Sequence, residues 1–210
     1  MSDCIFCNLE KIKEDIIYDG RNFFVKVGFS IVTPGHVMII SKSHYPCFAA
    51  IPNYLDNEYE NLTNELSRNI SKVFFEPFQL EYGVWGQSVN HAHTHFIPLK
   101  GKGYEIKDII AEMQISEGIN VEEVDANKLK DIYMKEGSYV SIKTRDKLYM
   151  CHTKGLPPKT AFQNPGLSYN AFFTLKKGVE VPSWQNMLEK HKIIDESNRI
   201  ITKQKLLNLF

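Results

Sequence analysis

The chain has 210 residues, and its 25 Lys and Arg side chains balance 25 Asp and Glu, so the formal net charge is zero. This balance provides no general attraction to a nucleic-acid backbone or an anionic membrane surface, and we expect neither as a partner. No apolar run approaches the roughly 20 residues that a membrane-spanning helix needs. The first residues lack the basic and apolar pattern of a secretion signal, so the expected location is cytoplasmic.

Strand and helix patterns alternate along the first half of the chain. Five short segments are predicted strands, because they are rich in β-branched and aromatic residues or are otherwise strand-like in pattern. They are residues 16–18, 23–27, 37–40, 80–84 and 88–98. Apolar residues at helical spacing predict a helix over residues 55–75, which Pro77 ends. The expected domain is α+β, with this helix packed on a mostly antiparallel sheet of about five strands.

The composition changes after Gly101 and Gly103, where we place a boundary between a domain over residues 1–103 and an extension over residues 104–210. The extension is expected to be a smaller α+β unit of unknown role. Its predicted elements are helices over residues 105–115 and 127–133, a hairpin formed by residues 139–144 and 148–152, and a helical pattern over residues 184–210.

Three histidines, His91, His93 and His95, alternate along the last predicted strand of the first half. Side chains alternate between the faces of a strand, so all three are expected on one side, starting about 6.6 Å apart. A lone histidine is usually structural. Three imidazoles in a row are costly in a core and unusual on a surface, so this pattern indicates a functional site.

The three imidazoles allow two kinds of chemistry. They are compatible with a catalytic metal site, because three imidazoles leave one position open for water or substrate. Alternatively, one imidazole is a nucleophile towards phosphorus while its neighbours handle protons and phosphate charge. Gly86, Gln87 and Ser88 favour the second interpretation, because they precede the strand and offer backbone, amide and hydroxyl donors to phosphate oxygens.

Three segments together resemble the histidine-triad (HIT) family of nucleotide hydrolases and transferases. Residues 86–98 resemble its signature, residues 33–44 its middle strand and the following loop, and Cys4-Ile5-Phe6-Cys7 the opening of its zinc-containing members. The resemblance covers about the first half of the chain. It implies a HIT-like sheet and, by analogy, a homodimer.

The resemblance assigns roles within the signature. His93 would be the nucleophile that attacks the α-phosphorus of a purine nucleotide or dinucleoside polyphosphate, and water or another acceptor would resolve the nucleotidyl-imidazole. His95 would bind phosphate and help to protonate the leaving group. The nucleotide-binding residues would be Gly86, Gln87, Ser88, Ile5 and Phe6, the last two lining a base pocket.

The resemblance also implies a structural zinc site built from Cys4, Cys7, His44 and His91, because two thiolates and two imidazoles close a tetrahedral site. His36 is expected to have a structural or supporting role.

Two positions depart from the family pattern. Gly28 stands where many members carry an acidic residue for the ribose, and Lys26 stands in place of an aromatic residue of the base pocket. The altered Gly28 is the best support for a third hypothesis, a nucleotide sensor that binds without turnover.

Overall fold

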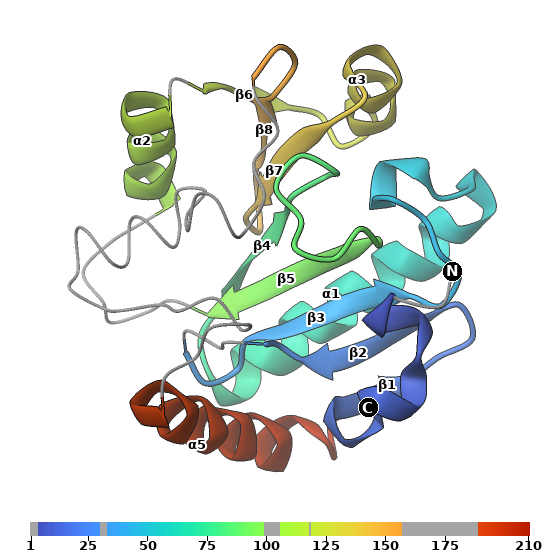
Figure 1. Cartoon of the computed structure of the whole chain (residues 1–210), viewed down its shortest axis with the longest axis vertical. Helices are drawn as coiled ribbons and strands as arrows, with labels where there is room; N and C mark the ends of the chain where they lie inside the picture. Colours follow the sequence, from blue (N-terminus) through green and yellow to red (C-terminus); the bar gives the residue numbers. More distant parts are fainter. Residues whose placement is uncertain (1–3, 30–32, 99–105, 118, 157–188) are drawn as a thin grey trace.

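The computed structural model describes residues 4–29, 33–98, 106–117, 119–156 and 189–210 (Figure 1). Eight strands of these residues form one sheet in the order β1-β2-β3-β5-β4-β7-β8-β6, and all neighbouring strands pair antiparallel. The strands are β1 (Ile16–Asp19), β2 (Phe23–Val27), β3 (Val37–Ser41), β4 (Pro77–Glu81), β5 (His93–Pro98), β6 (Asn120–Val124), β7 (Tyr139–Lys143) and β8 (Leu148–His152).

Four α-helices accompany the sheet in the described part of the chain: α1 (Asp56–Val73), α2 (Ile106–Glu117), α3 (Lys128–Glu136) and α5 (Glu189–Leu206). Short 3-10 turns include Ile5–Cys7, Lys13–Asp15 and Phe48–Ala50. The α+β class is therefore confirmed. The expected helical pattern over residues 184–188 lies outside the described residues.

The first-half prediction of five strands and one long helix agrees with the structure, but the sheet is wider than predicted. The hairpin β7–β8 and strand β6 add three strands to it. Strand β6 was missed because most of its side chains are exposed and polar, so it lacks an apolar alternation. Strand β4 pairs with β5 on one side and β7 on the other, so one sheet runs through both halves (Figure 1). The boundary at residue 103 stays a prediction.

Two predicted strand boundaries were wrong. Strand β4 ends at Glu81, because Gly83 and Val84 turn the chain with φ angles of 46° and 81°. Strand β5 begins only at His93, because the backbone bends where the His91 N–H donates to the Val89 carbonyl at 2.8 Å. His91 therefore precedes the strand and is not one of its alternating residues.

Helix α1 covers one face of the first-half strands. Its Leu62, Leu66 and Ile70 recur every four residues and are buried in a core that includes Val25 and Phe96. Strands β2 and β3 are buried along their whole lengths, because both of their faces are covered. The opposite face carries a second cluster around Phe6, described below.

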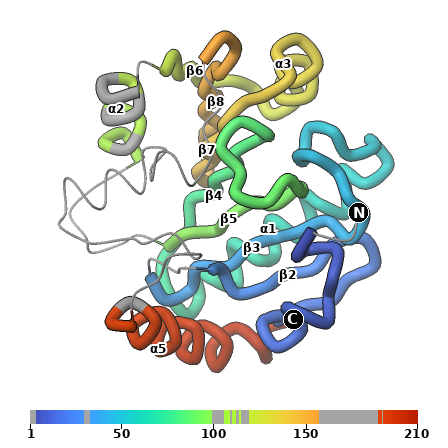
Figure 2. Tube along the Cα trace, viewed as in Figure 1, coloured from blue at the N-terminus to red at the C-terminus, as the bar shows by residue number. Residues whose placement is uncertain are grey.

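The C-terminal helix returns to the first-half strands, as the red end of the tube beside the blue strands shows (Figure 2). The ring of Phe210 lies 5.0 Å from that of Tyr18, and the Asn69 amide donates to the Leu209 carbonyl at 2.8 Å. Leu206, the last residue of α5, is also buried in the core beneath α1, so α5 is part of the packing around the first-half sheet.

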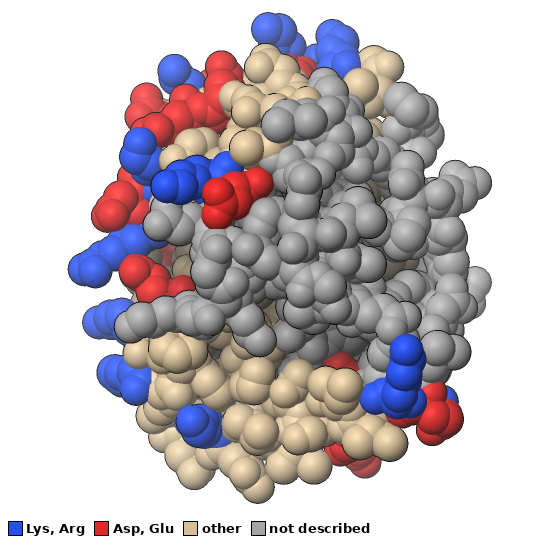
Figure 3. Space-filling view, turned by 90° about the vertical axis from the view of Figure 1, so that its left-hand side faces the viewer, with Lys and Arg blue, Asp and Glu red and all other residues tan. Residues whose placement is uncertain are grey.

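None of the described helices is long and apolar enough to cross a membrane. On the face shown in Figure 3, the basic and acidic side chains of the described residues lie interspersed and are not gathered by sign. This arrangement agrees with the balanced charge of the sequence.

Candidate active site and metal centre

His93 and His95 project from β5 on the face of the sheet opposite α1. In the register of the sheet His93 lies opposite Ile40 and His95 opposite Met38, and Ile40 and Met38 belong to the cluster around Phe6. The rings of His93 and His95 have centroids 5.2 Å apart. The structure thus brings the last two histidines of the motif together on one face, as expected from their spacing.

The His93 ring is held by the backbone. Its Nδ1 lies 2.6 Å from the carbonyl oxygen of His91, and since a carbonyl only accepts, this nitrogen donates its proton there. The other ring nitrogen, Nε2, is then unprotonated in the neutral ring. Burial lowers the pKa of His93 to about 4, outweighing the hydrogen bond to the His91 carbonyl. His93 is therefore a neutral imidazole with a free lone pair at neutral pH.

A fourth imidazole supports His95. His36 precedes β3, is 1% exposed, and places its Nε2 3.0 Å from Nδ1 of His95. Burial, and secondarily the charge of Lys26, lowers the pKa of His36 to about 3. Burial and neighbouring positive charges hold the pKa of His95 well below its usual value. This contact agrees with the supporting role expected for His36, but the sequence did not identify its partner, which depends on the register of β3 with β5.

Phe6 forms a wall of the site beside the histidines. Its ring centroid lies 5.2 Å from that of His93 and 5.8 Å from that of His91, and it stacks on Phe29 at 6.0 Å. The side chain is 1% exposed, whereas its neighbour Ile5 is only partly buried. Both residues expected to line a base pocket therefore lie in the cluster next to the histidines.

The loop before β5 holds the residues expected to bind phosphate. The Gln87 side-chain amide donates to the Pro46 carbonyl at 2.7 Å, and its Oε1 is buried with no hydrogen-bond partner among the described residues. Gly86 and Ser88 lie in bends, and none of the three residues has strand geometry. Their role towards phosphate stays a prediction.

Lys26 and Gly28, the two departures from the family pattern, contact a partly buried charge cluster. Lys26 is fully buried, with its Nζ 2.6 Å from the Val27 carbonyl and 3.5 Å from Asp15, and burial lowers its pKa to about 7. Arg199 of α5 forms an ion pair with the same Asp15 and donates to the Gly28 carbonyl at 2.8 Å. The C-terminal helix thus reaches Gly28, one of the two positions that depart from the family pattern. Sequence reasoning missed Asp15 and Arg199, because neither belongs to a motif.

Four potential zinc ligands converge beside the loop that precedes β5. The ligand atoms of Cys4, Cys7, His44 and His91 all lie within 4.8 Å of one another. The Nδ1 of His91 is 3.4 Å from the Cys4 sulfur and 3.5 Å from the Cys7 sulfur, and the Cys7 sulfur is 3.2 Å from Nδ1 of His44. A tetrahedral zinc with ordinary ligand distances separates a sulfur from a nitrogen by about 3.6 Å. The four residues therefore fit such an ion.

The orientation of His91 suits metal binding. Its Nε2 lies 2.7 Å from the Ser41 carbonyl oxygen and donates its proton there, which leaves Nδ1 unprotonated towards the two cysteines. The three histidines of the motif have different partners. His91 faces the cysteines, Nδ1 of His93 faces the His91 carbonyl, and Nδ1 of His95 faces His36, so the three rings do not converge on a single metal position. In the described part of the chain, the Cys4 cluster is the only metal-ligand group found.

An antiparallel sheet that presents two alternating histidines, with a third beside them in a Cys2His2 cluster, defines a protein of the histidine-triad class. Comparison with known proteins agrees. The HIT domain family matches residues 10–102. Protein hit of Bacillus subtilis strain 168 is 33% identical over 110 residues, covering 48% of this chain and 74% of that protein. An uncharacterized HIT-like protein of Methanocaldococcus jannaschii is 27% identical over 113 residues, covering 50% and 85%. The chain belongs to the HIT family.

Solved structures resemble the chain over a similar extent. A zinc-bound histidine triad family protein from Mycobacterium smegmatis is 20% identical, with a TM-score of 0.40, and covers 49% of this chain and 80% of that one. A HIT-like protein from Bartonella henselae is 19% identical, with a TM-score of 0.44, and covers 50% and 82%.

Proposed function

We propose that the chain is a nucleotide phosphoester or phosphoramidate hydrolase, or a nucleotidyl transferase, that works through a nucleotidyl-histidine intermediate on His93. Membership of the HIT family supports a nucleotide-binding hydrolase or transferase in general. The hydrogen bond from Nδ1 of His93 to the His91 carbonyl carries the specific proposal, because it leaves Nε2 bare and fixes the ring.

The reaction has two displacements. Nε2 of His93 donates its lone pair to the α-phosphorus, and the bond from phosphorus to the leaving group breaks. In the tautomer in which His36 donates to Nδ1 of His95, the proton of His95 sits on its Nε2, from which it can pass to the leaving group. Water or another acceptor then attacks phosphorus and gives its proton back to Nε2 of His95, the phosphorus–nitrogen bond breaks, and the imidazole of His93 is restored.

The substrate in this proposal is a purine nucleotide or dinucleoside polyphosphate. Gly86, Gln87 and Ser88 would hold the phosphate oxygens, and Ile5 and Phe6 would contact the base. The position of Phe6 beside the His93 ring supports the last assignment.

The proposed cofactor is a structural zinc ion held by Cys4, Cys7, His44 and His91. An ion bound by four protein ligands has no open position, so it would tie the N-terminal segment to the active-site loop without taking part in the chemistry. The same geometry argues against the alternative of a metal-dependent hydrolase, because it places His91, His93 and His95 on different partners. The second candidate function is a nucleotide sensor that binds without turnover. It is favoured by Gly28, which stands in place of an acidic residue and whose carbonyl accepts from Arg199.

A homodimer and a cytoplasmic location are also part of the proposal. Strand β4 is not free to pair with a second copy of the chain, because it already pairs with β7. A dimer that extends the sheet would therefore have to form through β1 or β6, the two outer strands.

The substitution His93→Asn tests the proposal, with adenosine 5′-phosphoramidate as substrate. We expect kcat to fall by on the order of a thousandfold or more, because the nucleophile is lost, while AMP still binds in calorimetry. The matched control is His152→Asn, which removes an imidazole on β8 and should leave turnover unchanged. Turnover by His93→Asn at the wild-type rate would contradict the mechanism. Absence of turnover by the wild-type protein, with intact AMP binding, would favour the sensor.

A further inference from the structure

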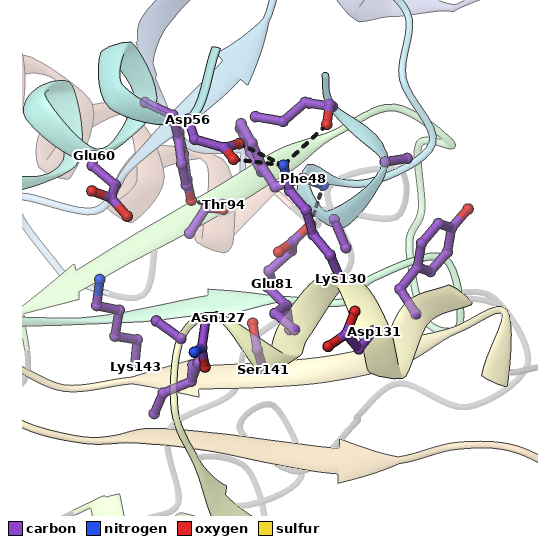
Figure 4. A pocket seen from close by; sticks show the side chains of 18 of the residues that line it. Phe48, Asp56, Glu60, Glu81, Thr94, Asn127, Lys130, Asp131, Ser141 and Lys143 are labelled. Carbon is purple, nitrogen blue, oxygen red and sulfur yellow. Dashed lines mark hydrogen bonds and ion pairs between the residues drawn. The ribbon is translucent and has the colours of Figure 1, made fainter. Parts of the chain in front are cut away.

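A cavity of about 1040 Å³ lies on the face of the sheet opposite the histidines (Figure 4). Thr94, which lines it, sits between His93 and His95 on β5 and therefore points to the other side of the strand. Glu81 of β4 and Ser141 of β7, directly opposite each other in the sheet, line its floor. The cavity is thus separated from the proposed catalytic site by the thickness of the sheet.

Both halves of the chain build the walls of the cavity. The 3-10 turn Phe48–Ala50 and the start of α1 line one side, and α3 lines the other. Figure 4 shows Lys130 reaching from α3 to Asp56, where its Nζ lies 2.7 Å from both carboxylate oxygens. The same nitrogen lies 2.8 Å from Oδ1 of Asn53. Ligand pockets have volumes of roughly 300–1,000 Å³, so this cavity is large enough for a small molecule.

Glu81 is a buried carboxyl group in the lining of this cavity that the proposed reaction does not use. It is 3% exposed, and its Oε1 accepts from the backbone N–H of Phe48 at 2.7 Å. Glu81 forms no ion pair with any of the residues that the structure describes. Burial raises its pKa to about 7, although hydrogen bonds from Phe48 and Tyr139 act in the opposite direction. A cation beside this carboxyl would restore its ionised form.

The other charges of the lining favour a cation. Four carboxyl groups face two ammonium groups there: Asp56, Glu60, Glu81 and Asp131 against Lys130 and Lys143. Lys130 is already paired with Asp56, so three carboxyl groups remain against one ammonium group. The lining also offers an apolar surface, in which the rings of Phe48 and Tyr59 stack 4.0 Å apart.

We propose that this cavity binds a small protonated amine with an apolar or aromatic body, whose ammonium group pairs with Glu81 while its body packs on Phe48 and Tyr59. The polar group fixes orientation and the aromatic surface supplies contact area, the combination that small-molecule sites use. The site lies on the other face of the sheet from His93, so this proposal does not rest on the proposed function.

Calorimetry with three probes of similar shape tests the charge that the cavity prefers. The full chain is titrated with 2-phenylethylamine, the neutral 2-phenylethanol and the anionic 3-phenylpropionate. We expect the amine to bind at least about tenfold more tightly than either analogue, since one close charge pair is worth that much or more in a buried site. Failure of the amine to bind, or equal affinity for the amine and the alcohol, overturns the proposal.

Two variants, each lacking one carboxylate, test which side chain of the cavity pairs with the ammonium group. Glu81→Gln keeps a carbonyl oxygen for the Phe48 N–H and should weaken amine binding by about tenfold or more, with alcohol binding unchanged. Glu60→Gln, at the exposed rim, should weaken it by less than about threefold, because exposed charges are screened. Equal effects of the two variants would contradict the assignment to Glu81.

A measurement on the unmodified side chain avoids dependence on the folding of Glu81→Gln. The carboxyl carbon of Glu81 is titrated by nuclear magnetic resonance with and without 2-phenylethylamine. The midpoint should move to lower pH when the amine is bound, because a cation stabilises the carboxylate, and an unchanged midpoint contradicts the proposal. The amine should also bind His93→Asn with wild-type affinity, which keeps this test separate from that of the catalytic mechanism.

Discussion

His91 links the proposed zinc site to the proposed nucleophile through three of its own atoms. Its Nδ1 faces the cysteine sulfurs, its Nε2 donates to the Ser41 carbonyl, and its backbone carbonyl accepts from Nδ1 of His93. The residue that would anchor the metal therefore also supplies the acceptor that selects the tautomer of His93. His91 can have both roles because it lies before β5 and does not alternate with His93 and His95. Its side chain is therefore able to turn towards the N-terminal cysteines.

The substitution Cys7→Ser tests the zinc site. We expect the wild-type protein to contain one zinc ion per chain by elemental analysis, and the variant to lose it together with thermal stability. Cys7 is exposed, and without a metal its substitution would change the free energy of unfolding by only about 0.5 kcal/mol. The control is Cys47→Ser, a buried thiol that packs with Tyr139 and Met150 and is not among the four ligands, which should destabilise the protein and keep its zinc. A wild-type protein without zinc after purification free of chelators would contradict the site.

The turn after β4 joins elements from the two halves. Gly83 has a positive φ of 46°, and a Cβ there would lie 2.6 Å from the ring of Tyr139, the first residue of β7. Gly83 also accepts from the Tyr139 N–H at 3.0 Å. The ring and the glycine therefore pack at a distance that no other residue type permits.

Two glycine substitutions separate close packing from backbone strain. Gly83→Ala should lower the free energy of unfolding by roughly 3 kcal/mol, because it adds a clash with Tyr139 to the strain of a left-handed residue. Gly137→Ala, whose φ is also positive but whose Cβ would meet nothing within 4 Å, should cost only about 1 kcal/mol. Denaturant unfolding measures both values, and equal losses would show that the contact with Tyr139 contributes nothing.

A histidine holds together three elements of the extension. His152 on β8 has its Nδ1 2.8 Å from Glu136 of α3 and its Nε2 3.0 Å from Glu122 of β6. Its side chain is 23% exposed. Burial acts to lower the pKa of His152, but the hydrogen bonds and charges of the two glutamates together raise it above its usual value. The ring is thus more readily protonated in the folded protein than in the unfolded chain.

The stability of the protein should therefore depend on His152 in a pH-dependent way. A raised folded-state pKa contributes stability that is fully present below the unfolded value of about 6.5 and is lost as pH rises through the folded value. His152→Gln should cost roughly 1 kcal/mol at pH 6 and less at pH 9, in denaturant unfolding. The control Lys147→Gln, which removes the exposed ion pair with Glu123, should have the same small effect at both values. An equal cost of His152→Gln at both pH values would contradict this role.

The whole molecule combines parts that local sequence determines with parts that depend on distant contacts. Strands β1 to β3 and helix α1 were predicted close to their observed bounds, because their residues repeat at the period of the structure they form. The pairing of β7 with β4 and the return of Arg199 to Gly28 could not be predicted, since both join residues far apart in the sequence. Strand β6, with its exposed polar side chains, carries no local signal of its own.

The candidate site divides in the same way. The spacing of His93 and His95 was enough to place them on one face, and the family resemblance was enough to group Cys4, Cys7 and two histidines. The contact of His36 with His95 and the burial of Lys26 required the register of β2, β3 and β5. The cavity around Glu81 could not be predicted from the sequence either, because its lining residues come from both halves of the chain.

The most direct measurement is to trap the bond between His93 and phosphorus. The protein is mixed with adenosine 5′-phosphoramidate, quenched at alkaline pH, where a phosphorus–nitrogen bond to imidazole survives, and digested for mass spectrometry. We predict a peptide that contains His93 and is heavier by one adenylyl group, with the label lost after acid treatment and absent from His93→Asn. Rapid turnover with no label on any peptide, or a label on a residue other than His93, would contradict the account.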